Sequence, residues 1–194
     1  MTKDEFLLRF NLLQRGDSGH NYQHHKPLKN AAVLIGLVEP DHKAGQQGLQ
    51  VLLTKRASHL KHHPSQVSFP GGKVEPDDSS LVATAIRESE EEIGLQESAI
   101  NVIGQLPAYQ TISGYQVTPI IAFIEKNQRF TIDKNEVAEI FQVPLQHFLQ
   151  TDEHHIIVAS RNGKQHNVHF LPYKHYNIWG ATAVMLKDLV NHLS

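Results

Sequence analysis

The stretch RESEEEIG, residues 87–94, concentrates four glutamates directly before a glycine. Gly94 suits the left-handed position just past a helix end, and the segment 77–80, Asp-Asp-Ser-Ser, offers good N-cap residues. The sequence therefore predicts one helix over roughly residues 80–93. Acidic side chains in the last turn of a helix oppose the negative end of its dipole by about 0.3–1 kcal/mol each. Such a cluster calls for compensation.

Helical spacing divides this segment into two predicted faces. Steps of three and four residues bring Glu88, Glu91 and Glu92 together within one turn. The stripe that we expect to face the core lies opposite them and consists of Val82, Ile86, Ser89 and Ile93. Like charges at this spacing repel one another, and a divalent cation with hard oxygen ligands is the simplest compensation. The alternative is an ordinary solvated acidic face.

Composition limits the classes of function. A chain of 194 residues with 40% hydrophobic composition is long enough for one domain with a core of its own. The net charge of −2 gives no general attraction for nucleic acid or anionic lipid, so we expect neither partner. The acidic, amphipathic start and the lack of a long apolar run favour a cytoplasmic protein without membrane spans. Because cysteine is absent, a bound metal must use oxygen or imidazole ligands.

Several short runs rich in Val, Ile and Leu predict β-strands. These runs lie at residues 31–38, 49–56, 100–106, 114–125 and 136–144. The polar, glycine-containing segment between the first two indicates a hairpin. Residues 154–171 predict a further strand pair around an Asn162-Gly163 turn.

Helical spacing recurs at both ends of the chain. Phe6, Phe10 and Leu13 predict an amphipathic helix within an N-terminal extension, residues 1–25. Residues 176–193 predict a closing helix. The order of strands, helix, strands and helix predicts a single mixed α/β domain over all 194 residues.

The charged stretch and the residues before it resemble the Nudix box. The usual form of that box is Gly, five residues, Glu, seven residues and then Arg-Glu-hydrophobic-any-Glu-Glu-any-Gly-hydrophobic. The matching residues are Arg87, Glu88, Glu91, Glu92, Gly94 and Leu95. Two departures are visible. Counted from Gly72, Asp78 stands for the first glutamate with eight residues before Arg87, and Ser89 stands where a hydrophobic residue is usual.

The segment 52–72, LLTKRASHLKHHPSQVSFPGG, resembles the element that precedes the box in the coenzyme A pyrophosphatase branch of this family. That element reads Leu-Leu-Thr-any-Arg-Ser/Ala, three residues, Arg, three residues, Gly, three residues, Phe-Pro-Gly-Gly. The matching residues are Leu52, Leu53, Thr54, Arg56, Ala57, Phe69, Pro70, Gly71 and Gly72. Lys61 replaces the second arginine and Ser65 replaces the first glycine. Lysine keeps the charge but loses the bidentate geometry of arginine.

The resemblance implies a Nudix-like mixed β-sheet sandwiched between helices, an α/β/α arrangement. It also implies an enzyme that hydrolyses a nucleoside diphosphate linked to another group, with Mg²⁺ or Mn²⁺ as cofactor. By resemblance Glu88, Glu91 and Glu92 bind the metal and the carbonyl of Gly71 adds a ligand. Arg87 is expected to orient Glu91.

A general base outside the box is expected among later carboxylates, and the resemblance points to the segment NEVAEIF. Glu136 and Glu139 are the candidates, with Glu136 preferred. Either could equally be an ordinary charge at a strand edge.

The same resemblance implies that the substrate is coenzyme A, split to 3′,5′-ADP and 4′-phosphopantetheine. Its extra 3′-phosphate needs cations, and the candidates are Lys55, Arg56 and Lys61, with the backbone at Gly72 close to the substrate. The alternatives are another nucleoside diphosphate derivative, such as ADP-ribose, NADH or a dinucleoside polyphosphate, and a non-catalytic nucleotide sensor. The sequence leaves the oligomeric state open, with a homodimer as one arrangement.

Two further groups of residues favour packing over chemistry. The histidine pairs at 24–25, 62–63 and 154–155 lack a helical ligand spacing, so we expect no histidine metal site. Tyr176 and Trp179 are expected in the core, although either ring could stack on adenine.

Overall fold

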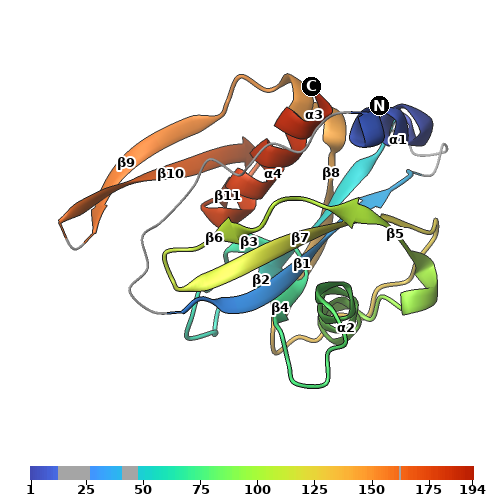
Figure 1. The fold of residues 1–194 in the computed structure, drawn as a ribbon, viewed down its shortest axis with the longest axis horizontal. Coiled ribbons are helices and arrows are strands. Elements are labelled where there is room, and N and C mark those ends of the chain that lie inside the picture. Colours follow the sequence, from blue (N-terminus) through green and yellow to red (C-terminus); the bar gives the residue numbers. More distant parts are fainter. Residues whose placement is uncertain (13–26, 41–47, 162) are drawn as a thin grey trace.

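The computed structural model describes residues 1–12, 27–40, 48–161 and 163–194. In this part of the chain, eight strands form a mixed sheet and three form a smaller one (Figure 1). The elements in chain order are α1 (Lys3–Leu12), β1 (Lys29–Val38), β2 (Gln50–Arg56), β3 (Val67–Ser68), β4 (Gly71–Lys73), α2 (Leu81–Ile93), the 3₁₀ turn η2 (Glu97–Ala99), β5 (Ile100–Gln105), β6 (Tyr109–Gln110), β7 (Tyr115–Ile124), β8 (Val137–Pro144), α3 (Leu145–Gln150), β9 (His155–Arg161), β10 (Lys164–Tyr173), β11 (Tyr176–Trp179) and α4 (Ala181–Leu193).

The centre of the large sheet is a parallel pair, β1 and β7. Their register runs without a break from Lys29 opposite Tyr115 to Val38 opposite Ile124. Both strands are nearly continuous runs of buried residues, as expected for strands covered on both faces. β2 and β4 pair antiparallel with β1, and β8 pairs antiparallel with β2. The predicted hairpin between the first two strands is therefore confirmed.

Two hydrophobic cores lie on the two faces of this sheet. One core contains α1, α4 and the inner face of the small sheet, and Phe6 of α1 stacks on Phe10 with ring centroids 5.6 Å apart. The other core contains α2, through Ala85 and Ile93, against Leu34 and other sheet residues. Figure 1 shows α2 on one side of the sheet and α1, α3 and α4 on the other. The mixed α/β fold with helices around a sheet is therefore confirmed.

The C-terminal segment differs from its prediction. Tyr176–Trp179 form strand β11 against β10, and the helix begins only at Ala181, after Gly180 with φ 65°. Side chains alternate along β11, because Tyr176 is buried whereas Trp179 keeps 37% of its surface exposed. A period of two marks a strand, so reading this segment as helix was wrong. Trp179 is likewise not a core residue.

The structure describes the N-terminal helix as α1, Lys3–Leu12. α1 carries Phe6 and Phe10, which are both buried as expected. Leu13 and the remainder of 13–25 lie outside the described residues, as does Asn162 of the predicted turn. Among the described helices, none has the length and apolar character needed to cross a bilayer.

Helix α2 has the predicted caps. The Ala83 N–H donates to the Ser80 hydroxyl at 3.1 Å, and Gly94 adopts φ 67° after the last turn. The buried face extends beyond the predicted one, however. Ser89 and Ile93 of the predicted stripe are buried as expected. Glu92 is buried as well, at 4% exposure, so it does not share a solvent face with Glu91.

Ser65 generates a prediction about stability. Its backbone has φ 59°, the left-handed region that costs a residue other than glycine about 1–2 kcal/mol. Glycine costs about 0.5–1 kcal/mol in chain entropy, so Ser65→Gly should raise the free energy of unfolding by up to about 1 kcal/mol in urea. Ser79→Gly is the control, because Ser79 is not in that region and the change should only destabilise. An equal loss of unfolding free energy in the two variants would contradict backbone strain at Ser65.

Candidate active site

Arg87 joins helix α2 to the loop before it. Its guanidinium donates five hydrogen bonds, two to Asp78 at 2.9 and 3.0 Å and one to the Lys73 carbonyl at 3.0 Å. The other two go to Glu88 at 3.1 Å and Glu91 at 3.0 Å. Every N–H of the side chain then has a partner. The predicted contact between Arg87 and Glu91 is present.

Asp78 is the residue that sequence reasoning undervalued. Its side chain is 5% exposed and accepts both arms of the Arg87 fork. That bond, the Glu75 N–H and the Thr84 hydroxyl hold the pKa of Asp78 well below its usual range. The bidentate pair fixes the loop to the helix. Its signal in the sequence was an acid upstream of the box, which was noted only as a departure from the pattern.

Glu88 lies against the backbone of β4. A Cβ placed on Gly72 would overlap the Glu88 carboxyl group, so glycine is required for this approach. The Glu88 side chain is 16% exposed. Burial raises its pKa, and the charges of Glu91 and Glu136 add to the rise against the opposing effect of Arg87.

Glu88, Glu91 and Glu92 form what we call the acidic cluster, and Glu92 is the most buried of the three. One carboxylate oxygen, Oε2, accepts the Gly71 N–H at 3.3 Å, and the other, Oε1, lies 3.7 Å from Nη1 of Arg56. Burial raises the pKa of Glu92 to about 8, with Glu88 contributing in the same direction and Arg56 opposing. The ionised form therefore lacks sufficient positive charge around it.

The glycine pair forms the start of the short strand β4. Gly71 pairs with Val33 and Gly72 with Ala32 in the β4–β1 ladder. Gly71 has φ 151°, and a Cβ there would overlap the Ala32 carbonyl and the Val33 Cα. Close pairing of the two backbones thus brings the Gly71 N–H within reach of Glu92.

The segment between β7 and β8 caps the C-terminal end of α2. The Thr131 N–H donates to the Ile93 carbonyl at 2.9 Å, and the Asp133 N–H to the Glu92 carbonyl at 3.0 Å. These bonds satisfy carbonyls that a helix end leaves free. They also bring Glu136, a few residues on, close to the acidic cluster.

The two candidate bases are in different surroundings. Glu136 is exposed, its charge acts on Glu88 and Glu92, and its carbonyl accepts the Ala57 N–H at 2.8 Å. Glu139 accepts a hydrogen bond from the Tyr176 hydroxyl. The geometry favours Glu136 because Glu139 is already engaged.

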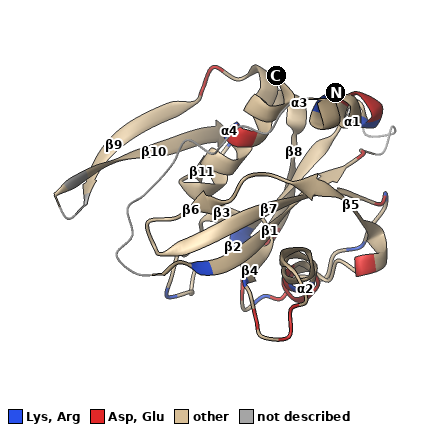
Figure 2. Cartoon of the chain, viewed as in Figure 1, with Lys and Arg blue, Asp and Glu red and all other residues tan. Residues whose placement is uncertain are grey.

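The candidate substrate cations are spread along β2 and the turn after it. Arg56 is 25% exposed and faces Glu92, whereas Lys55 is half-buried and lies opposite Glu139 in the strand register. Lys61 is exposed in the turn between β2 and β3. Figure 2 shows acidic residues gathered on α2 and on the loop that precedes it.

Among the described residues, no three acidic or imidazole groups converge on one point. Arg87 instead contacts Glu88 and Glu91, and Arg56 faces Glu92. The donor set nevertheless fits a hard divalent cation. The donors are carboxylate oxygens, which hard divalent cations prefer. Two of the side chains, Glu88 and Glu92, are mostly buried, and burial raises the pKa of both.

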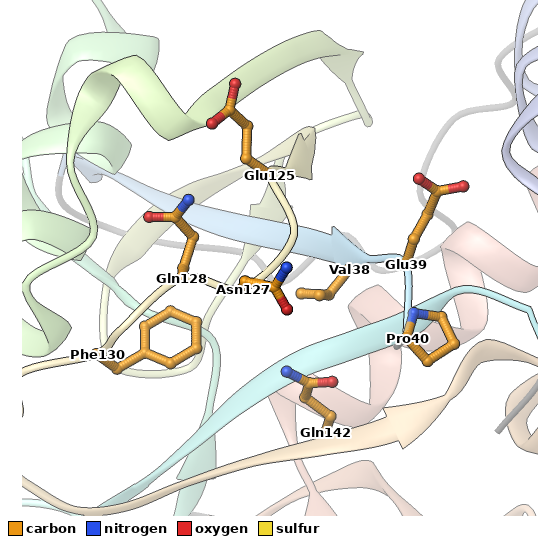
Figure 3. A pocket seen from close by; sticks show the side chains of 8 residues that line it. All are labelled: Val38, Glu39, Pro40, Glu125, Asn127, Gln128, Phe130 and Gln142. Carbon is orange, nitrogen blue, oxygen red and sulfur yellow. The ribbon is translucent and has the colours of Figure 1, made fainter. Parts of the chain in front are cut away.

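A separate cavity of about 200 Å³ lies at the carboxyl ends of β1 and β7 (Figure 3). Its lining residues are Val38, Glu39, Pro40, Glu125, Asn127, Gln128, Phe130 and Gln142. None of the candidate site residues lines it. Glu39 at this cavity is paired with Lys126 at 3.2 Å. The cavity is therefore distinct from the acidic cluster.

Comparisons with known sequences agree with this geometry. The NUDIX domain family model matches residues 28–168. The chain is 40% identical over 189 residues to the protein named uncharacterized Nudix hydrolase NudL of Enterobacter sp. (strain 638), covering 97% of this chain and 93% of that one. It is 41% identical over 191 residues to the protein of the same name from Salmonella dublin, with the same coverage of 97% and 93%.

Solved structures share the fold. A Nudix hydrolase from Alicyclobacillus acidocaldarius matches with a TM-score of 0.54 at 16% identity, covering 87% of this chain and 93% of that one. A MutT/nudix family protein from Enterococcus faecalis matches with a TM-score of 0.52 at 16% identity, covering 98% of this chain and 68% of that one. The chain therefore belongs to the Nudix hydrolase family, whose enzymes act on phosphorus-containing anhydrides.

Proposed function

We propose that this Nudix hydrolase splits the pyrophosphate bond of coenzyme A and its derivatives, yielding 3′,5′-ADP and 4′-phosphopantetheine. The observation that carries the hydrolytic part is the pair of mostly buried glutamates, Glu88 and Glu92, against the glycine backbone of β4. Two such carboxylates are poorly compensated by the protein alone. A divalent cation, Mg²⁺ or Mn²⁺, supplies the missing charge.

Glu88, Glu91 and Glu92 would hold the cation, with the Gly71 carbonyl as a further ligand. When bound, the cation neutralises phosphate charge, lowers the pKa of bound water and aligns attacking and leaving oxygens. Arg87 holds two of these carboxylates in place from its fixed position on Asp78. The carboxylate of Glu136 would accept the proton of the attacking water.

Support for coenzyme A comes from the segment 52–72. Arg56, Lys55 and Lys61 would meet the phosphates, with the Gly72 backbone close to them. Arg56 already lies beside the acidic cluster, 3.7 Å from Glu92. A charge-assisted hydrogen bond from one of these cations to a phosphate oxygen would contribute about 1.5–3 kcal/mol.

A hydrolysis screen with Mg²⁺ or Mn²⁺ tests the substrate. Coenzyme A, dephospho-coenzyme A, ADP-ribose, NADH and diadenosine polyphosphates would be compared by kcat/KM, with products separated by chromatography. We expect coenzyme A to be preferred over dephospho-coenzyme A by roughly ten- to hundredfold, because only the former carries the 3′-phosphate. Equal rates would make a broader nucleotide pyrophosphatase the better assignment. Binding without turnover of any compound would indicate a sensor.

The glycine pair gives a matched test of the site. Gly72→Ala should leave the free energy of unfolding within about 1 kcal/mol, because only the movable end of Glu88 is in the way. Its Mn²⁺ affinity and kcat should nevertheless fall at least about tenfold, since second-layer changes of this kind typically cost that much. Gly71→Ala should instead destabilise the fold by about 2–4 kcal/mol, through backbone overlap at φ 151°. Normal turnover in Gly72→Ala would refute the role of Glu88.

The raised pKa of Glu92 predicts how stability depends on pH without metal. A carboxyl whose pKa is about 8 when folded, against an ordinary 4.5, binds more protons in the folded state between those values. The free energy of unfolding in EDTA should thus fall as the pH rises from 5 to 9, by an amount on the order of 3 kcal/mol. Urea titrations of Glu92→Gln should lack this decline. Glu90→Gln, at an exposed position, should keep it.

The two carboxylates after β7 predict different kinetic losses. Glu136→Gln should lower kcat by about 10²–10⁴-fold with little change in Mn²⁺ affinity, as expected for a general base. Glu139→Gln should cost less, because its partner is the Tyr176 hydroxyl. Single-turnover rates with saturating metal would separate the two. A larger loss in Glu139→Gln would reassign the base.

A further inference from the structure

Two arginines contact the acidic cluster, and they differ in how firmly they are held. Arg87 and Arg56 are almost equally exposed, at 24% and 25% of the side chain. Arg87 donates five hydrogen bonds to surrounding oxygens. Within the residues that the structure describes, the Arg56 guanidinium has a single ionic contact, to Glu92 at 3.7 Å, which is too long for a hydrogen bond. One guanidinium is fixed and the other is movable.

The backbone of Arg56 is nonetheless well anchored. Its N–H donates to the Gln66 carbonyl at 2.9 Å, and the next N–H, of Ala57, donates to the Glu136 carbonyl at 2.8 Å. The register shifts here, because Lys55 pairs with Glu139 and Arg56 with Val137, so the extra residue, Ala138, lies in the partner strand β8. The backbone at Arg56 is therefore held in place while its guanidinium is not.

The oxygen that Arg56 faces is the one that a metal needs. Oε2 of Glu92 accepts the Gly71 N–H, which leaves Oε1 toward Arg56. A divalent cation carries twice the charge of a guanidinium and competes directly for that oxygen. The repulsion between the two positive charges weakens the hold of Oε1 on Arg56 when a cation binds there.

We propose that Arg56 is a transferable counter-ion, which neutralises Glu92 before metal binds and passes to a phosphate oxygen of the substrate once a cation takes Glu92. This rests on the proposed function, since it requires both cation and phosphate at the site. Arg87 cannot take this role, because its N–H groups are all engaged. Cation binding and phosphate binding are then coupled through Arg56, and by linkage the coupling acts in both directions.

A cycle without metal or turnover tests the transfer. Binding of inorganic pyrophosphate in EDTA would be measured by calorimetry for the wild type, Glu92→Gln, Arg56→Ala and the double variant. Glu92→Gln should free the guanidinium and tighten pyrophosphate binding about three- to tenfold. The gain should vanish in the Arg56→Ala background. A gain of equal size in both backgrounds would overturn the proposal, since it would reflect net charge alone.

Glu91→Gln is the matched control. It removes the same charge from the same helix, but Glu91 contacts Arg87 rather than Arg56. Any gain in pyrophosphate affinity should be smaller than for Glu92→Gln and should persist in the Arg56→Ala background. A Glu91→Gln gain as large as that of Glu92→Gln, and equally lost with Arg56→Ala, would contradict a specific Arg56–Glu92 exchange.

A second readout does not depend on the Glu92 variant. Mn²⁺ binding followed by electron paramagnetic resonance, without phosphate, should be several-fold tighter in Arg56→Ala because the competing cation is gone. With pyrophosphate present the advantage should shrink or reverse. Unchanged Mn²⁺ affinity under both conditions would reject the competition.

If the cycle holds while the wild-type protein hydrolyses no nucleotide, the counter-ion role stands and only the proposed function fails.

Discussion

The burial of carboxylates where helix α2 meets strand β4 is the constraint on which the rest of the site depends. Glu92 is 4% exposed and Glu88 is 16% exposed. A buried charge loses its hydrating water and needs protein partners or a cation in its place. β4 supplies one through the Gly71 N–H and leaves room for Glu88 at Gly72. Because those donors are too few to offset burial, the pKa of both carboxyls is raised. The burial of these carboxylates by the fold therefore favours the binding of a cation.

Arginine placement decides how that affinity is used. Arg87 is saturated by Asp78, Lys73 and two glutamates, so it serves as a rigid connection between loop and helix. Arg56, on β2, lies 3.7 Å from Glu92, which is beyond hydrogen-bond distance. The difference arises from context, because both carry the same charge and similar exposure. Rigid positioning and exchangeable charge are therefore divided between two residues of the same type.

The sequence predicted the elements whose signals are local. Caps at Ser80 and Gly94 gave the bounds of α2, and apolar runs gave the long strands. It failed where tertiary contact decides. The apolar stripe placed Glu92 toward solvent, but the glycine backbone of β4 lets the helix approach on its polar side, so Glu92 turns inward. Likewise the four residues before Gly180 form a strand, since β10 offers an edge that no local pattern reveals. The substrate cations, the location in the cell and the oligomeric state stay predictions.

The two departures from the Nudix box pattern are compensated in the structure. Asp78 is one methylene shorter than the usual glutamate, yet the chain between it and Arg87 is one residue longer, and both its oxygens reach the guanidinium at 2.9 and 3.0 Å. The Thr84 hydroxyl and the Glu75 N–H both donate to Oδ2 of Asp78 as well. Ser89, in the usual hydrophobic place, is fully buried but donates to the Ala85 carbonyl at 2.7 Å, which satisfies its hydroxyl within the helix. The shorter acid with the longer spacing therefore still closes the Asp78–Arg87 pair, and the buried serine leaves no hydroxyl unsatisfied.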